Sequence, residues 1–130
     1  MIAALYAGLL TFLYVYLAFR VIARRRAVRI GLGDEGDVIL LRAMRAHGNL
    51  AEYVPLGLVL MLLAELGGAA DFLVHGVGLC LLAGRCLHAY GVSREAEESP
   101  GRFIGMILTF AALLVAAAVC VIEFLMAFPG

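Results

Sequence analysis

Polar side chains recur at helical spacing inside a segment that is otherwise apolar. Arg45, Asn49 and Glu52 stand three or four residues apart, and Arg42 extends the series by one turn toward the N-terminus. Residues at these spacings share one face of an α-helix, so the four side chains would form a polar stripe. Guanidinium groups bind carboxylates through paired hydrogen bonds, which suits a small anionic ligand. Glu52 would hold an ammonium group of that ligand or orient the arginines.

Two further segments carry ionisable groups near their ends. Arg85 and His88 lie one helical turn apart, and Arg102 follows a Ser-Pro-Gly sequence that opens the last apolar segment. A charged side chain placed toward the bilayer centre costs at least about 2.5–3.5 kcal/mol, so it must face a partner or a wet cavity. We therefore expect these groups to meet at one end of a bundle, with Glu52 paired to Arg45 or to an arginine of the third segment.

Other polar residues are better explained without a ligand. Arg24, Arg25, Arg26 and Arg29 form a basic cluster at a helix end, which is typical of topology signals and of headgroup contact. His75 has no polar neighbour at helical spacing, so a packing role is favoured. The three cysteines lie in apolar runs without the spacing of a disulfide framework or a zinc site, so they are expected to be buried and no metal site is expected.

The composition is that of a membrane protein. Apolar residues make up 65% of the 130 positions and charged residues 15%, with a mean hydropathy of +1.03. A soluble domain of this length could not bury so much apolar surface. Ordinary soluble enzymes, disordered chains and disulfide-stapled secreted modules are thereby excluded. The formal net charge is zero, so no overall field would recruit nucleic acid.

Four membrane-spanning helices account for the pattern. The uncharged runs 2–19 and 103–122 are each long enough to cross a bilayer. The shorter runs 53–64 and 72–84 reach that length if their helices continue into flanking residues. The sequence thus predicts an all-α four-helix bundle in a single transmembrane domain, 1–130. Its helices are expected near 2–26, 38–66, 70–91 and 100–127.

The arginines predict the orientation. Every basic residue is an arginine, and all of them flank the first and third connections between helices. The second connection carries only the acids Glu65 and Asp71. Because Lys and Arg in short loops favour the cytoplasmic side, the first and third connections should face the cytoplasm. Both termini would then lie on the other side.

The polar stripe resembles a known family. The sequence Arg45-Ala-His47-x-Asn49-x-x-Glu52-x-x-Pro55 is similar to the helix-two signature of the MAPEG superfamily, the membrane-associated proteins of eicosanoid and glutathione metabolism. Gly84-Arg85-x-x-His88 resembles the helix-three motif of the same group, and the four-helix layout is similar along the whole chain. The resemblance implies a homotrimer that binds glutathione between neighbouring protomers near the cytoplasmic face. The abundance of Ala, Gly and Leu and the use of arginine as the sole basic residue indicate a bacterial source, so we expect the protein in the inner membrane.

The resemblance also implies roles for individual residues. Arg45, Asn49 and Glu52 match glutathione-contacting positions of helix two. Arg102 matches the arginine that lies beside the glutathione sulfur in catalytic members, so it is the expected catalytic residue. The other implied glutathione ligands are polar residues of helix three and an arginine that helix one of an adjacent subunit would contribute: Arg85, His88, Tyr90 and Arg24, with Arg20 as the competing register for Arg24.

Several positions depart from the family pattern. Phe103 stands where the prostaglandin-forming members have a serine, and Met106 replaces a tyrosine one turn further on. Gly48 replaces a basic residue before the motif asparagine, and Val92 replaces a tyrosine after the motif histidine. The half of the site that would hold a tripeptide is therefore better preserved than the half that would activate a thiol.

Two functions remain open from the sequence. The first is a glutathione transferase or peroxidase that acts on a lipophilic electrophile reaching the site from the lipid bilayer. The second is a non-catalytic trimeric membrane protein that binds another anionic ligand or a lipid headgroup.

Overall fold

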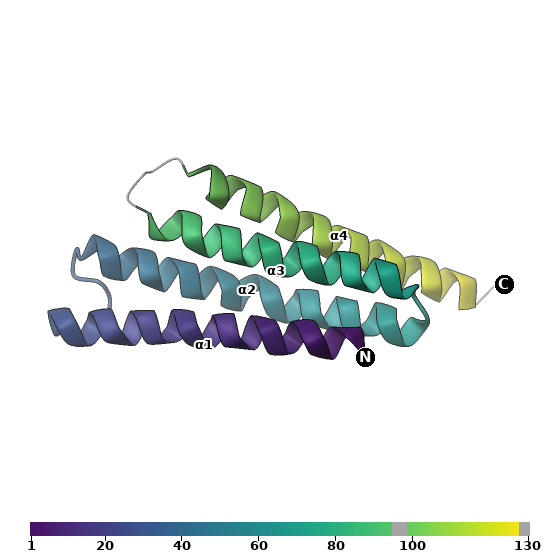
Figure 1. The fold of residues 1–130 in the computed structure, drawn as a ribbon, viewed down its shortest axis with the longest axis horizontal. Helices are drawn as coiled ribbons and strands as arrows, with labels where there is room; N and C mark the ends of the chain where they lie inside the picture. Colours follow the sequence, from purple (N-terminus) through teal and green to yellow (C-terminus); the bar gives the residue numbers. More distant parts are fainter. Residues whose placement is uncertain (95–98, 128–130) are drawn as a thin grey trace.

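Four long helices make up the fold. The computed structural model describes residues 1–94 and 99–127, and within these ranges it contains α1 (Ile2–Val28), α2 (Val38–Gly67), α3 (Asp71–Ser93) and α4 (Pro100–Ala127) and no strand. The helices run side by side along one long axis (Figure 1). The expected all-α four-helix bundle is confirmed, and each helix begins and ends within two residues of its expected position.

Local sequence signals explain where the helices begin and end. The side chain of Asp37 accepts a hydrogen bond from the backbone N–H of Leu40 and caps the start of α2. Gly68 ends α2 in the left-handed conformation, at φ 103°, which glycine adopts without steric cost. Pro100 opens α4 at a position where the missing N–H carries no penalty. Pro55 lies inside α2, which continues through it.

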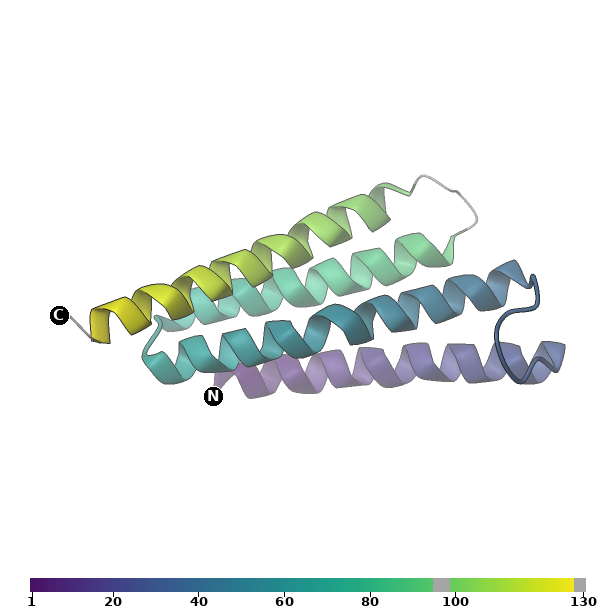
Figure 2. The ribbon, with the colours of Figure 1, turned by 180° about the vertical axis from the view of Figure 1, so that it is seen from behind.

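The beginning of α1 and the end of α4 lie at one end of the bundle. The N-terminal end of α1 and the C-terminal end of α4 flank the connection between α2 and α3 (Figures 1 and 2). The connection from α1 to α2, the end of α3 and the start of α4 lie at the opposite end. We call this opposite end the arginine-rich end, because the basic cluster of α1 and residues Arg42, Arg45, Arg94 and Arg102 lie toward it.

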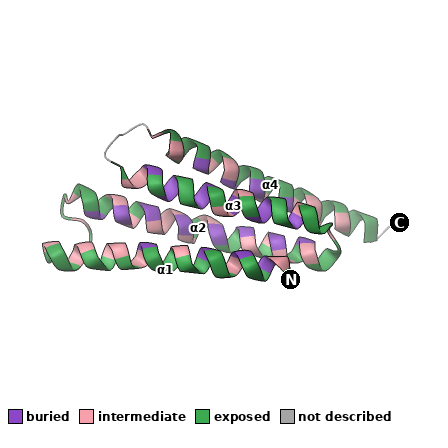
Figure 3. Cartoon of the chain, viewed as in Figure 1, coloured by how far each residue is buried: buried purple, intermediate pink, exposed green. Residues whose placement is uncertain are grey.

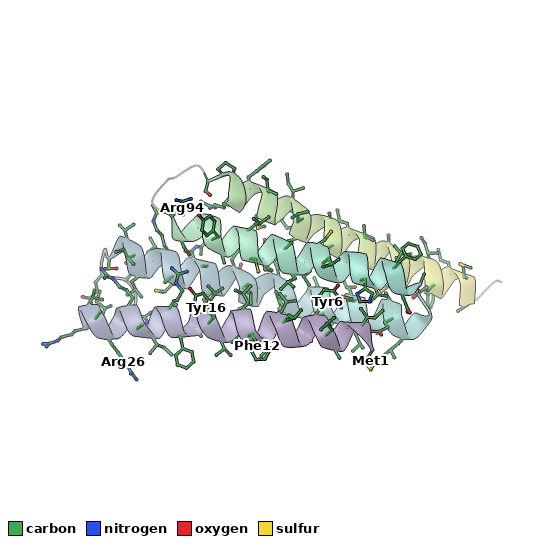
Figure 4. The ribbon with its side chains drawn as sticks, in the orientation of Figure 1. Met1, Tyr6, Phe12, Tyr16, Arg26 and Arg94 are labelled. Carbon is green, nitrogen blue, oxygen red and sulfur yellow. The ribbon has the colours of Figure 1, made fainter. Side chains whose placement is uncertain are left out.

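The bundle presents apolar side chains outward. Much of the outer surface of every helix is exposed (Figure 3), and Phe12 on α1 points away from the other helices (Figure 4). Phe12 is 76% exposed and Phe103 is 69% exposed. Water would not favour such a surface, whereas acyl chains would cover it without cost. All four helices are long and apolar enough to cross a membrane.

A tyrosine from α1 provides the polar neighbour that the sequence did not reveal for His75. The Tyr6 hydroxyl lies 3.1 Å from His75 Nδ1 and donates to the His75 carbonyl at 3.2 Å. In Figure 4, Tyr6 points from α1 toward the remaining helices. The two aromatic rings meet edge to face. The partner comes from another helix, which is why helical spacing within α3 could not predict it.

Helices α3 and α4 pack most closely, because glycines face each other across their interface. A Cβ atom added to Gly105 would lie 2.6 Å from the Gly84 carbonyl oxygen and 2.6 Å from the His88 backbone nitrogen. Small residues at such a crossing let helix backbones approach in a membrane. The close approach places the side chains of α3 and α4 next to one another at the arginine-rich end.

Gly105→Ala is expected to destabilise the fold by about 2 kcal/mol, because the added methyl group meets rigid backbone atoms and forces the two helices apart. Reversible unfolding in mixed micelles measures this change. The matched control is Gly76→Ala on α3, where an added Cβ meets nothing within 4 Å. The control should be neutral or slightly stabilising. Equal losses in the two variants would contradict the role of Gly105 in helix contact.

Candidate anion-binding cleft

A cleft opens between three helices at the arginine-rich end. Its volume is about 360 Å³, within the range of small-molecule sites. The residues around it come from α2, α3 and α4, which the close α3–α4 contact brings together. The lining residues are Val38, Leu41, Arg42, Arg45, Asn49, His88, Gly91, Val92 and Arg102.

The cleft is basic. Arg45 on α2 and Arg102 on α4 are both exposed and face it from separate helices. None of the described residues that line it is acidic. Fixed cations on two walls of a concave surface attract an anion and favour bidentate contacts with its oxygens. The geometry therefore suits a small ligand that carries carboxylate groups.

Arg85 does not line the cleft but lies behind the residues that do. Its side chain is 1% exposed and is not among the residues that line the cleft. The Arg85 Nε donates to Thr109 Oγ1 at 2.9 Å, and one terminal nitrogen donates to Asn49 Oδ1, also at 2.9 Å. Arg85 thus links α3 to α4 and to α2, and among the described residues that line the cleft it donates a hydrogen bond to Asn49.

No carboxylate lies in an ion pair with Arg85 within the described part of the chain. The guanidinium instead lies 5.4 Å from the centre of the Tyr53 ring and 3.3 Å from the Met106 sulfur. An aromatic face, an amide and a hydroxyl replace the carboxylate that a buried cation normally requires. The structure therefore encloses a cation that neutral groups solvate.

The expected ion pair of Glu52 is wrong. Glu52 is exposed on the outer side of α2, near Leu56 and Val59, which are more than half exposed. Within residues 1–94 and 99–127 it forms no ion pair, with Arg45, with Arg85 or with any other residue. The spacing placed Glu52 and Asn49 on one face correctly, but that face is broad. Asn49 lies at its half-buried edge and Glu52 at its exposed edge.

Two further expected ligands lie outside the cleft. Tyr90 is 59% exposed, and its hydroxyl accepts a hydrogen bond from Arg94 at 2.8 Å. Arg24 forms a bidentate pair with Asp37, at 2.6 Å and 3.1 Å. Arg20, the alternative to Arg24 as the helix-one arginine of the site, donates to Ser93 Oγ at 2.7 Å. The cleft brings together Arg45, Asn49, His88 and Arg102, with Arg85 behind Asn49.

The Arg24–Asp37 pair joins the end of α1 to the cap of α2. Hydrogen bonding to Arg24, with a further bond from the Leu40 N–H, lowers the pKa of the Asp37 carboxyl from its usual value near 3.8. A lowered pKa in the folded state stabilises the fold above the unfolded pKa, and this contribution disappears as the pH falls through the folded value. The pair also helps to order the first connection, which Arg25 contacts through the Gly33 carbonyl at 2.8 Å.

Asp37→Asn is expected to reduce the acid sensitivity of the protein below about pH 4, because the amide keeps the helix cap but cannot titrate. Thermal midpoints of the wild type and the variant, measured between pH 3 and pH 7, test this. The difference should be largest at neutral pH and should shrink on acidification. A difference that grows as the pH falls would contradict the assignment.

Sequence reasoning missed the residues that hold Arg85 in place. Thr109 is fully buried and is the one hydroxyl side chain in the apolar run 103–122. Its isolation in that run was a usable signal. Tyr53 and Met106 gave no such signal, because aromatic residues and methionines in a membrane helix ordinarily pack against lipid or neighbouring helices. The burial of the cysteines was also overestimated, since Cys86 is exposed.

The helices and the cleft define an integral membrane helical bundle with a basic cavity at one end. Residues 3–122 match the MAPEG family, and the chain belongs to that family. The chain is 42% identical over 114 residues to the inner membrane protein YecN of Escherichia coli (strain K12), a match that covers 88% of this chain and 86% of the relative. The YecN protein of Escherichia coli O6:H1 gives the same values. The protein is an integral inner-membrane protein.

Proposed function

We propose that the cleft binds glutathione and that the protein is a glutathione-dependent transferase or peroxidase acting on lipophilic electrophiles at the cytoplasmic interface. The observation that carries the proposal is the approach of Arg45 and Arg102 from separate helices to one cleft of about 360 Å³, in which none of the described lining residues is acidic. Glutathione presents two carboxylates and a thiol, a combination that such a cleft suits. Membership of the MAPEG family supports this choice of ligand.

In this proposal the residues divide between binding and chemistry. Arg45 pairs with a carboxylate of the tripeptide, and Asn49 adds a hydrogen bond to an oxygen beside it. Arg102 lies next to the sulfur, where a fixed positive charge lowers the thiol pKa from its usual value near 8.5. The resulting thiolate is the nucleophile.

The proposed transfer is a substitution at an electrophilic carbon. The thiolate sulfur forms a bond to that carbon, and the leaving group departs with the electron pair of the bond that breaks. The thiol proton has passed to solvent before this step. Because the cleft lies at the end of the bundle and the outer helix surfaces are apolar, a lipophilic second substrate reaches it by partitioning into the bilayer.

The proposal includes a homotrimer. Glu52 is a carboxylate on the outer surface of a membrane-spanning helix, where acyl chains cannot solvate it. A neighbouring protomer would cover this surface and would bring its own arginines near the carboxylate. The number three follows from the family resemblance, and the cytoplasmic placement of the arginine-rich end follows from the distribution of arginines.

The test of the enzymatic proposal is a conjugation assay with detergent-solubilised protein. Glutathione and a chloro-nitroaromatic electrophile are mixed with the enzyme, and formation of the thioether is followed by absorbance. Turnover that saturates with glutathione and exceeds the uncatalysed rate is expected. Conjugation no faster than the reaction without protein, together with no reduction of an organic hydroperoxide, would reject the enzyme.

One observation favours the alternative, a non-catalytic protein that binds a lipid headgroup or another anion. Phe103, next to Arg102, is exposed to the surroundings of the bundle, and Met106 places its sulfur against Arg85. Neither side chain supplies a hydroxyl near Arg102. The alternative predicts that Arg102→Ala leaves all ligand-dependent properties unchanged, which calorimetric binding measurements on the wild type and the variant would test.

A further inference from the structure

We infer that buried Arg85 is a positioning residue, which orients the Asn49 amide so that only hydrogen-bond donors face the cleft. The ligand group at that point must then be an oxygen acceptor, such as a carbonyl or a carboxylate. The inference rests on the proposed use of the cleft as a binding site. It adds a specificity rule for one wall of that site.

The chemistry of the two side chains decides the orientation. A guanidinium group has five N–H donors and no acceptor, so only the oxygen of the Asn49 amide can lie against it. Asn49 Oδ1 lies 2.9 Å from the Arg85 nitrogen. The amide nitrogen therefore points away from Arg85. It forms no hydrogen bond with the described residues, and Asn49 lines the cleft whereas Arg85 does not.

Contacts on its other sides fix Arg85 in place. Thr109 donates its hydroxyl proton to the Gly105 carbonyl at 2.8 Å, so the lone pairs of its oxygen accept from Arg85 Nε at 2.9 Å. Thr109 is fully buried, and the Tyr53 ring closes another side of the guanidinium. With both neighbours held, Arg85 cannot rotate to release the amide oxygen without losing hydrogen bonds in a buried environment.

The arrangement also strengthens the donors. An amide oxygen that accepts from a cation polarises the amide, and linked hydrogen bonds reinforce one another in a low dielectric. The Asn49 N–H groups thus become better donors to an anionic oxygen. An ammonium group or an N–H at the same point would meet two donors and no acceptor. The cleft wall at Asn49 accordingly selects for ligand oxygens.

Asn49→Asp separates this role from a structural one. Aspartate has the same shape and still accepts from Arg85, now as an ion pair, but it presents an oxygen to the cleft in place of the donors. The thermal midpoint of the ligand-free variant should equal or exceed that of the wild type. Its dissociation constant for glutathione, measured by calorimetry, should rise at least tenfold. A residue needed only for folding would not show stability and affinity changing in opposite directions.

Thr109→Val tests the positioning step, because Thr109 does not line the cleft. The isosteric valine removes the acceptor of Arg85 Nε, and the affinity for glutathione should fall several-fold. Thr109→Ser restores the hydroxyl and should recover the affinity. Thr11→Val is the control, since Thr11 is exposed and its hydroxyl donates to the Ala7 carbonyl of its own helix.

Inorganic sulfate serves as a second probe, so that the specificity rule and the glutathione proposal can fail separately. Weaker binding of both probes by Asn49→Asp, at unchanged or higher stability, supports both. Binding of sulfate but not glutathione by the wild type, with the same loss in the variant, supports the rule and rejects glutathione. The rule is overturned if Asn49→Asp binds like the wild type, if its ligand-free midpoint falls, or if the wild type binds neither probe.

Discussion

Arg85→Ala is expected to lower the free energy of unfolding by about 3 kcal/mol, the scale of large-to-small substitutions in packed cores. The side chain is 1% exposed and joins its own helix to α2 and α4. Its loss therefore leaves a cavity and leaves Asn49 Oδ1 and Thr109 Oγ1 without the donor that they share. Burying a guanidinium without a carboxylate partner costs desolvation free energy. The alanine variant no longer bears this cost, which offsets part of its loss of stability. The cavity is the larger effect because alanine fills almost none of the space.

Two other substitutions make the Arg85 prediction specific. Arg94→Ala, at the C-cap of the same helix, removes an exposed arginine and should change stability little. Arg85→Met fills most of the volume with a neutral side chain and should recover most of the stability, but it should not recover ligand affinity. Unfolding in mixed micelles of detergents measures all three. An Arg85→Ala variant as stable as Arg94→Ala would show that the buried network contributes nothing to the fold.

Arg102→Ala is expected to reduce glutathione conjugation at pH 7 by roughly 100-fold, comparable to removal of one charge-stabilising donor from an active site. Arg102 lines the cleft and is exposed, so its side chain is free of the packing that constrains Arg85. Its proposed action is on the thiolate, so binding of the tripeptide should change only a few-fold. The rate constants and the glutathione KM, measured in one assay, separate the two effects.

The pH dependence provides the control for Arg102. Without the fixed charge, the apparent thiol pKa in the complex should return toward 8.5, and the activity of Arg102→Ala should recover as the pH rises. Arg102→Lys retains a charge and should keep a larger part of the activity at pH 7. An alanine variant with wild-type turnover would favour the non-catalytic alternative.

The sequence was sufficient for the fold. Apolar runs such as 2–19 and 103–122 predict membrane helices because the bilayer imposes a minimum length on them. Residue type agrees with two of the observed helix ends: Pro100 opens α4 and Gly68 ends α2, as such residues usually do. Helical spacing also placed Arg45 and Asn49 on the face that lines the cleft.

The site could be predicted only in part, because spacing within one helix does not reveal the neighbouring helix. Helical spacing within α2 could not show that Asn49 contacts Arg85 while Glu52 points outward. These two orientations depend on the angle at which α2 packs against α3. The same limit hid the contact of His75 with Tyr6 on α1. Arg85 was expected to be a ligand, and only the close crossing of α3 and α4 explains why it lies buried behind Asn49.

The central claim, that the cleft of the arginine-rich end binds a small acidic molecule, is tested most directly by calorimetric titration of the detergent-solubilised protein with glutathione. Saturable binding is expected, with a dissociation constant that rises at least tenfold in Arg45→Ala. Binding should be unchanged in Arg26→Ala, whose side chain points away from the bundle (Figure 4). No heat of binding to the wild type, or equal affinities in the wild type and Arg45→Ala, would contradict the claim.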